Sequence, residues 1–121
     1  NIKFGLEYRI IPQINDQGMA IHVLSDVAGQ EVELLAFDCF EGEPHYHYGP
    51  RAKNQRLYLD KTAVPDPLEL ALDLFRGGKL APMLDRAGYR DHAAGLNPAV
   101  VAQSVAQVAE IATKMEAENN S

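Results

Sequence analysis

The sequence predicts an α+β fold, in which an antiparallel meander of four to five strands is followed by three helices packed on one face of the sheet. Two observations support this class. Apolar residues alternate with a period of two in the first half of the chain and recur with a period of 3.6 in the second half. The length of 121 residues suits one domain and is too short for two independent cores. We therefore expect a single domain over residues 1–121, with the sheet in residues 1–60 and the helices in residues 66–117.

Three segments of the first half have the composition of β-strands, namely residues 3–11, 19–24 and 31–40. Turn-forming residues at 15–18 and 28–30 separate them. The third segment is apolar on both faces, with Val32, Leu34, Ala36 and Phe40 on one and Leu35, Phe37 and Cys39 on the other. This composition is typical of a central strand that is covered on both sides.

The stretch 38–56 crowds ionisable, aromatic and turn-forming residues together, and it predicts a hairpin. Gly42 and Pro44 mark a turn before the alternating segment His45-Tyr46-His47-Tyr48. A turn centred between Gly42 and Glu43 places Asp38 opposite His47, Phe40 opposite His45, and Cys39 opposite Tyr46. Because successive side chains of a strand point to opposite faces, one face then carries Asp38, Phe40, His45 and His47, and the other Cys39, Tyr46 and Tyr48. A last short strand is expected over residues 57–60.

Three helices are predicted after residue 60. Asp66 as N-cap and Pro67 at the first helical position begin the first, and Gly77-Gly78 ends it. A shorter helix fits residues 80–87, and residues 90–92 form an exposed link. Asn97-Pro98 begins the longest helix, which runs to about residue 116 because no Gly or Pro interrupts it. Spacings of four, three, four and three place on one apolar face Val101, Val105, Val108, Ala112 and Met115.

Composition and charge narrow the classes of partner. The formal net charge is −6 and no Lys/Arg cluster is present, so nucleic acid is not an expected partner. No apolar run approaches the roughly 20 residues that cross a bilayer, so we expect no membrane partner. The single cysteine excludes an internal disulfide and, with no leader pattern, favours a cytoplasmic location. The first residue is Asn1, which leaves the earlier removal of a leader open.

His45 and His47 are separated by one residue, a spacing at which one face of a strand can offer two imidazoles to a divalent transition metal. A third ligand is required, for which the available donors are Asp38, His22 and Glu43. No complete ligand set is evident from the sequence. The competing interpretation is a half-exposed strand with packed tyrosines and hydrogen-bonded histidines.

Asp38 beside His47 is a candidate acid–base pair, since a carboxylate raises the pKa of a neighbouring imidazole and fixes its tautomer. No nucleophile accompanies the pair, because Cys39 belongs to the other face. Tyr48 can supply a hydroxyl donor, and Arg51 and Arg56 can contact an anionic ligand. The competing interpretation, which we favour, is that the arginines belong to a solvated loop without a ligand.

Two hypotheses follow, and the sequence leaves open whether the protein is an enzyme. The first is a non-enzymatic module that associates with itself or with a partner, because the long C-terminal helix carries more apolar surface than one stripe and two protomers could pair through it. The second is a small-molecule or metal-dependent enzyme that uses Asp38, His45 and His47, with Arg51 and Arg56 as anion contacts. The incomplete catalytic set places the enzyme second.

Overall fold

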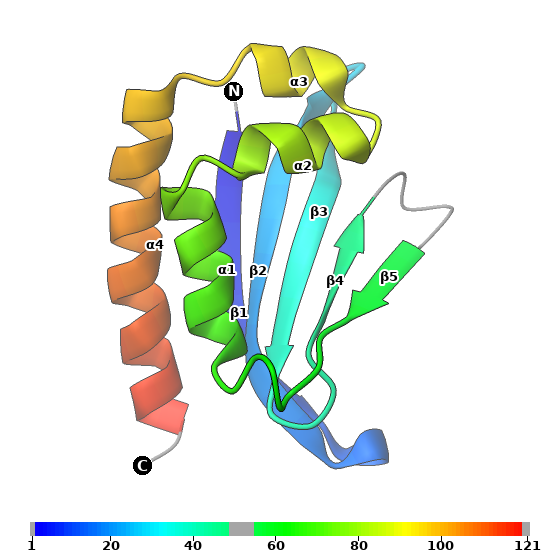
Figure 1. Cartoon of the computed structure of the whole chain (residues 1–121), viewed down its shortest axis with the longest axis vertical. Coiled ribbons are helices and arrows are strands. Elements are labelled where there is room, and N and C mark those ends of the chain that lie inside the picture. The colour runs from blue at the N-terminus through cyan, green and yellow to red at the C-terminus, as the bar shows by residue number, and fades with distance from the viewer. Residues whose placement is uncertain (1, 49–54, 120–121) are drawn as a thin grey trace.

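The computed structural model describes residues 2–48 and 55–119, which form a five-stranded antiparallel sheet followed by helices (Figure 1). The strands pair in chain order, which confirms the predicted meander and the α+β class. They are β1 (Ile2–Ile11), β2 (Asp16–Val27), β3 (Gln30–Phe40), β4 (His45–Tyr48) and β5 (Gln55–Tyr58). The helices are α1 (Pro67–Arg76), α2 (Leu80–Arg86), α3 (Arg90–Ala94) and α4 (Pro98–Asn119), and a 3-10 turn η1 (Pro12–Ile14) joins β1 to β2.

The helices cover one face of the sheet and leave the other open (Figure 1). Phe75 of α1 is central to the covered face, because its ring packs against Phe4 of β1 and Phe37 of β3 at centroid distances of 5.5 and 5.6 Å. The buried core around it includes Met19, Ile21, Val23, Leu35, Cys39, Leu68, Leu72, Leu80, Leu84, Val105 and Val108. Burial of this apolar surface is the main stabilising contribution to the fold.

Side-chain caps explain where the two longest helices begin. The Asp66 carboxylate accepts a hydrogen bond from the Glu69 amide at 3.1 Å, and Asn97 Oδ1 accepts one from the Ala99 amide at 3.0 Å. Val105 and Val108 of α4 are buried, and Val101 packs at the edge of the core, as the predicted stripe requires. No helix among the described residues is both long and apolar enough to cross a membrane.

Some boundaries differ from the prediction. The expected link at residues 90–92 is the short helix α3, and the last strand is Gln55–Tyr58 rather than residues 57–60. β2 begins at Asp16, so residues 15–18 are not the turn; η1 and Asn15, in the left-handed region at φ 51°, make the connection. The earlier turn lets β2 begin at Asp16 instead of residue 19 and leaves the end of β1 at Ile11, as predicted. The period-two pattern alone does not reveal this.

A β-bulge in the middle of β3 overturns part of the predicted face pattern. Val23 pairs with Leu35 and Leu24 pairs with Glu33, so Leu34 has no partner across the strands. Leu34 therefore joins the buried core instead of sharing a face with Ala36, and Glu33 takes its place on the open face.

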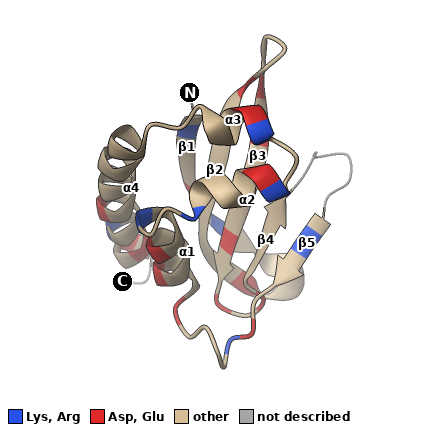
Figure 2. Cartoon of the chain, turned by 45° about the horizontal axis from the view of Figure 1, so that its top comes forward, with Lys and Arg blue, Asp and Glu red and all other residues tan. Residues whose placement is uncertain are grey.

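Charged residues of both signs are distributed over the molecule, and Lys and Arg are spread over several elements rather than gathered on one (Figure 2).

Candidate functional site

The β3–β4 hairpin has a register two residues away from the predicted one. Asp38 pairs with His45 and Ala36 pairs with His47, so the expected pairing of Asp38 with His47 is wrong. The predicted pairs of Phe40 with His45 and of Cys39 with Tyr46 are wrong for the same reason. A shift of two keeps every side chain on its face, because the side-chain period of a strand is two.

Asp16 at the start of β2 explains the shift. Its buried carboxylate accepts hydrogen bonds from the amides of Gly42 at 2.8 Å and Glu43 at 2.9 Å. The turn residues are therefore held against β2 instead of forming a symmetric loop between β3 and β4. A Cβ at position 42 would lie 3.1 Å from Asp16 Oδ2, which favours glycine there.

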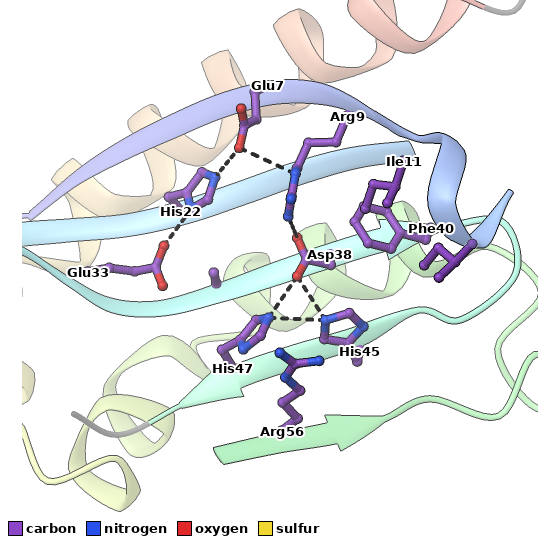
Figure 3. A pocket seen from close by; sticks show the side chains of 12 residues that line it. Glu7, Arg9, Ile11, His22, Glu33, Asp38, Phe40, His45, His47 and Arg56 are labelled. Carbon is purple, nitrogen blue, oxygen red and sulfur yellow. Dashed lines mark hydrogen bonds and ion pairs between the residues drawn. The ribbon is translucent and has the colours of Figure 1, made fainter. Parts of the chain in front are cut away.

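The open face of the sheet carries a hollow of about 650 Å³ (Figure 3). Residues from all five strands and from η1 line it. The charged and imidazole-bearing residues are Glu7, Arg9, His22, Glu33, Asp38, His45, His47 and Arg56. Ile11, Ile14, Ala36 and Phe40 are the apolar ones. The covered face behind the sheet is nearly all apolar, so the polar groups of the sheet gather here.

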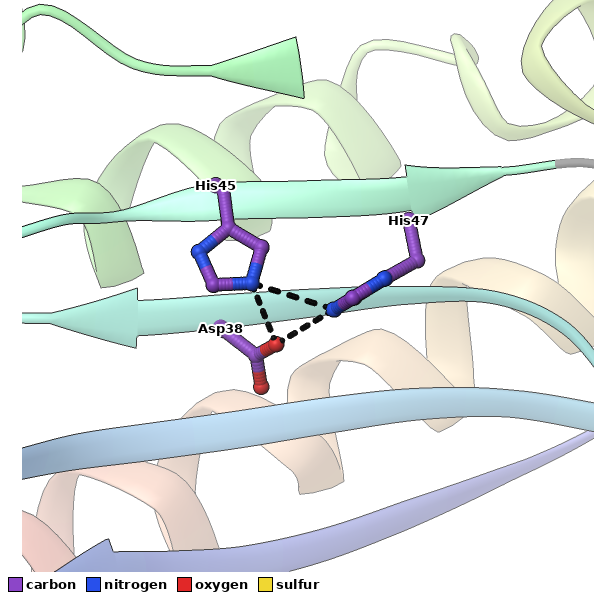
Figure 4. A group of neighbouring side chains, drawn as sticks. All are labelled: Asp38, His45 and His47. Atoms are coloured by element: carbon purple, nitrogen blue, oxygen red, sulfur yellow. Dashed lines mark hydrogen bonds and ion pairs between the residues drawn. The ribbon is translucent and has the colours of Figure 1, made fainter. Parts of the chain in front are cut away.

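Asp38, His45 and His47 converge on one point of this hollow (Figure 4). Asp38 Oδ2 lies 2.9 Å from His45 Nε2 and 2.8 Å from His47 Nε2, and the two Nε2 atoms are 3.0 Å apart. Asp38 is 2% exposed. Its other oxygen, Oδ1, accepts no hydrogen bond from the described part of the chain, and the guanidinium of Arg9 lies 3.6 Å from it.

The contact of His45 Nδ1 determines which nitrogen of the neutral ring carries the hydrogen. His45 Nδ1 lies 3.0 Å from the carbonyl oxygen of Glu43, and because a carbonyl only accepts, Nδ1 carries the hydrogen. In neutral His45 the lone pair is then on Nε2, which faces a carboxylate oxygen and another imidazole nitrogen. Electron pairs directed at one another require a hydrogen or a metal ion between them. A proton on His45 Nε2, the hydrogen of His47 Nε2 shared by both acceptors, or a metal ion each meets this requirement.

The charges within the cluster shift the pKa values of His45 and Asp38. Burial alone would lower the pKa of His45, but the hydrogen bond and the charge of Asp38 outweigh it, and the net pKa is raised. Burial likewise pushes the pKa of Asp38 upward, whereas its bonds to His45 and His47 bring the net pKa below the ordinary value. Asp38 is therefore a carboxylate at neutral pH, which is the form that binds a cation.

A second group of charges lies beside the first. His22 Nδ1 lies 2.6 Å from Glu33 Oε1 and His22 Nε2 lies 2.9 Å from Glu7 Oε1, and both nitrogens donate when the ring is protonated. Arg9 lies between the groups, 4.0 Å from Glu7 and 3.6 Å from Asp38. Sequence reasoning missed Glu7, Arg9 and Glu33. The alternation of β1 could have placed Glu7 and Arg9 on one face, whereas the bulge hides the position of Glu33.

The remaining candidates lie elsewhere. Arg56 pairs with His47 across β4 and β5 and lines the hollow, whereas Arg51 lies outside the described residues. Tyr48 belongs to the helix-covered side, where the guanidinium of Arg86 stands 5.3 Å from its ring centroid. Cys39 is buried on that side, and burial raises the pKa of its thiol far above the usual range.

Comparison with known proteins gives a family and no described activity. No curated protein and no solved structure matches the chain. One family model matches residues 1–112, which is most of its length. The chain therefore belongs to the family described as a domain of unknown function (DUF7700).

Proposed function

We propose that this domain is a binding module whose open sheet face holds a divalent transition metal ion through Asp38, His45 and His47. The observation that carries the proposal is the meeting of three donor atoms, Asp38 Oδ2 and two Nε2 nitrogens, at mutual distances of 2.8, 2.9 and 3.0 Å. Two imidazoles and one carboxylate form a ligand set suited to first-row transition metals.

The spacing of these atoms supports an octahedral ion. One face of an octahedron with metal–ligand bonds of about 2.0–2.1 Å has edges of about 2.9 Å. The hydrogen bond from His45 Nδ1 to the Glu43 carbonyl is also the second-shell contact that orients a ligating histidine and keeps its Nε2 available.

The lining of the hollow favours binding over turnover. No Ser, Thr or Cys side chain lines it among the residues that the structure describes, so it offers neither a hydroxyl nor a thiol nucleophile. The proposed function therefore combines the two hypotheses drawn from the sequence. The protein is a non-enzymatic module, as in the first, and it binds metal through Asp38, His45 and His47, as in the second.

Metal titration of the purified protein tests this proposal. After dialysis against EDTA, calorimetry with Zn²⁺, Co²⁺ and Ni²⁺ should show one site per chain. Loss of a second-shell contact costs roughly 10- to 100-fold in metal affinity, so removal of a direct ligand by His47→Ala or Asp38→Asn should cost about 100-fold or more. His92→Ala is the matched control, because His92 is on α3 and outside the hollow.

Circular dichroism of each variant establishes that the fold is kept. Absence of binding in the unmutated protein would overturn the proposal. Equal loss in His92→Ala and His47→Ala would do so too, since it would show that the ion binds histidines without regard to the cluster.

Self-association and a cytoplasmic location stay predictions. Support for the first is the exposure of Val100 and Ile111 on α4, which are 55% and 50% exposed. The buried free thiol of Cys39 agrees with a reducing compartment.

A further inference from the structure

We propose that the hollow binds a small organic acid whose carboxylate coordinates the metal ion and contacts the guanidinium groups of Arg9 and Arg56. This inference rests on the proposed metal site and names the class of ligand that the site would take. The acid would be a monocarboxylate with a short apolar body.

The open coordination positions face the hollow. All three protein donors come from the neighbouring strands β3 and β4, and they occupy one face of the coordination sphere. An octahedral ion held on one face keeps three positions for other ligands. Because Asp38, His45 and His47 themselves line the hollow, those positions are reached from it (Figure 3).

The charge balance of the hollow calls for an anion once a metal is bound. Glu7 and Glu33 are engaged by His22, whose two ring nitrogens both face carboxylate oxygens. Asp38 offsets one of the two charges of the ion. Arg9 and Arg56 are positive, and His22 offsets at most one of the two charges of Glu7 and Glu33. The lining and the ion together then keep a net positive charge, which a carboxylate complements.

The two arginines keep donors for such a ligand. The nearest approaches of Arg9 to Glu7 and Asp38 are 4.0 and 3.6 Å, which are ion-pair contacts beyond hydrogen-bond range. Its guanidinium also stands 5.7 Å from the ring centroid of Phe40 at the wall of the hollow. Within residues 2–48 and 55–119, Arg56 forms no ion pair with a carboxylate, although it lies opposite His47.

The size and the apolar wall of the hollow define the rest of the ligand. A volume of about 650 Å³ is within the range of small-molecule sites and far exceeds the space that one ion needs. Ile11, Ile14 and Phe40 belong to the lining, with the Phe40 ring beside the guanidinium of Arg9, and these apolar side chains can cover a hydrocarbon chain. Ile14 is 55% exposed, so a ligand there would bury apolar surface.

Binding of hexanoate to the Co²⁺-loaded protein tests the inference, because the visible absorption of Co²⁺ reports a change of its ligands. Hexanoate should change this spectrum and bind more tightly than acetate, and inorganic phosphate should bind more weakly than hexanoate. Arg56→Gln should weaken hexanoate about tenfold, the effect of one charge-assisted hydrogen bond, and should leave Co²⁺ affinity within about threefold. Arg86→Gln is the matched control, since Arg86 stands over Tyr48 on the opposite face.

The two proposals fail in different ways. Failure of Co²⁺ to bind overturns the metal site and this inference together. If Co²⁺ binds but hexanoate leaves its spectrum unchanged, the metal site stands and the organic acid is ruled out. Phosphate that binds as tightly as hexanoate, or equal losses in Arg56→Gln and Arg86→Gln, would also overturn the inference.

Discussion

The two faces of the sheet differ in what holds their residues in place. On β3 the neighbours Phe37 and Asp38 point in opposite directions, Phe37 into the apolar layer beneath the helices and Asp38 into the hollow. The contacts of Phe37 are with large apolar side chains, whereas Asp38 meets ionisable groups from β1 and β4. The covered face therefore contributes mainly stability, and the open face holds the groups able to bind a ligand.

The largest effect on stability is expected from the covered face. Phe75→Ala removes a fully buried ring that packs on Phe4 and Phe37, and it should lower the free energy of unfolding by about 3–5 kcal/mol. Chemical denaturation followed by circular dichroism measures the loss. His47→Ala on the open face should cost no more than about 1.5 kcal/mol, because it removes one hydrogen-bonding group without opening a core cavity. Equal costs for the two variants would remove the distinction between the faces.

The sequence predicts the covered face better than the open one, because the covered face depends on patterns within each element. The cap at Asp66 and the stripe of Val105 and Val108 are local features, and both occur as predicted. The alternation of the hairpin also places Asp38, His45 and His47 on one face. The distances between their donor atoms depend on the folded structure. From the sequence, Asp38 is only one of several candidates for the third metal ligand.

Interactions between distant residues account for what the sequence did not reveal. The register of the β3–β4 hairpin depends on Asp16, which is 26 positions before Gly42. The position of Glu33 on the open face depends on a bulge in the pairing of β2 with β3. A periodic pattern shows which residues alternate between the two faces. It does not reveal a register shift of two residues or an extra residue in one strand.

Asp16 connects the two faces, and its removal should have the next largest effect. Asp16→Ala leaves the amides of Gly42 and Glu43 without their acceptor, which should cost about 1–3 kcal/mol. The same change should weaken the metal site, because the Glu43 carbonyl then no longer holds His45 Nδ1 in a fixed position. Calorimetry with Zn²⁺ and chemical denaturation measure the two effects on the same sample.

Asp60→Ala is the matched control for Asp16→Ala. Asp60 also accepts a backbone amide, that of Thr62, but it does so on the exposed surface and joins no strands. Its loss should cost less than about 1 kcal/mol and leave Zn²⁺ affinity unchanged. Unchanged metal affinity in Asp16→Ala would show that the turn does not position His45.

The smallest effect is expected from His22, and it should depend on pH. His22 faces Glu33 of β3 and Glu7 of β1, and the hydrogen bond to Glu33, reduced by burial and reinforced by Glu7, raises the pKa of His22 above 6.5. A group whose pKa is raised on folding stabilises the folded state fully below its unfolded pKa, and that contribution disappears as the pH rises through the folded pKa. His22→Gln cannot be protonated, so the two proteins should differ most below about pH 6.5 and converge above the folded pKa.

The difference in the free energy of unfolding between the two proteins should stay below about 1 kcal/mol, because Glu7 is half exposed. Denaturation at a series of pH values in EDTA measures it, and contributions common to both proteins cancel in the difference. A difference that grows with pH would mean that His22 is neutral in the folded protein and offsets neither Glu7 nor Glu33.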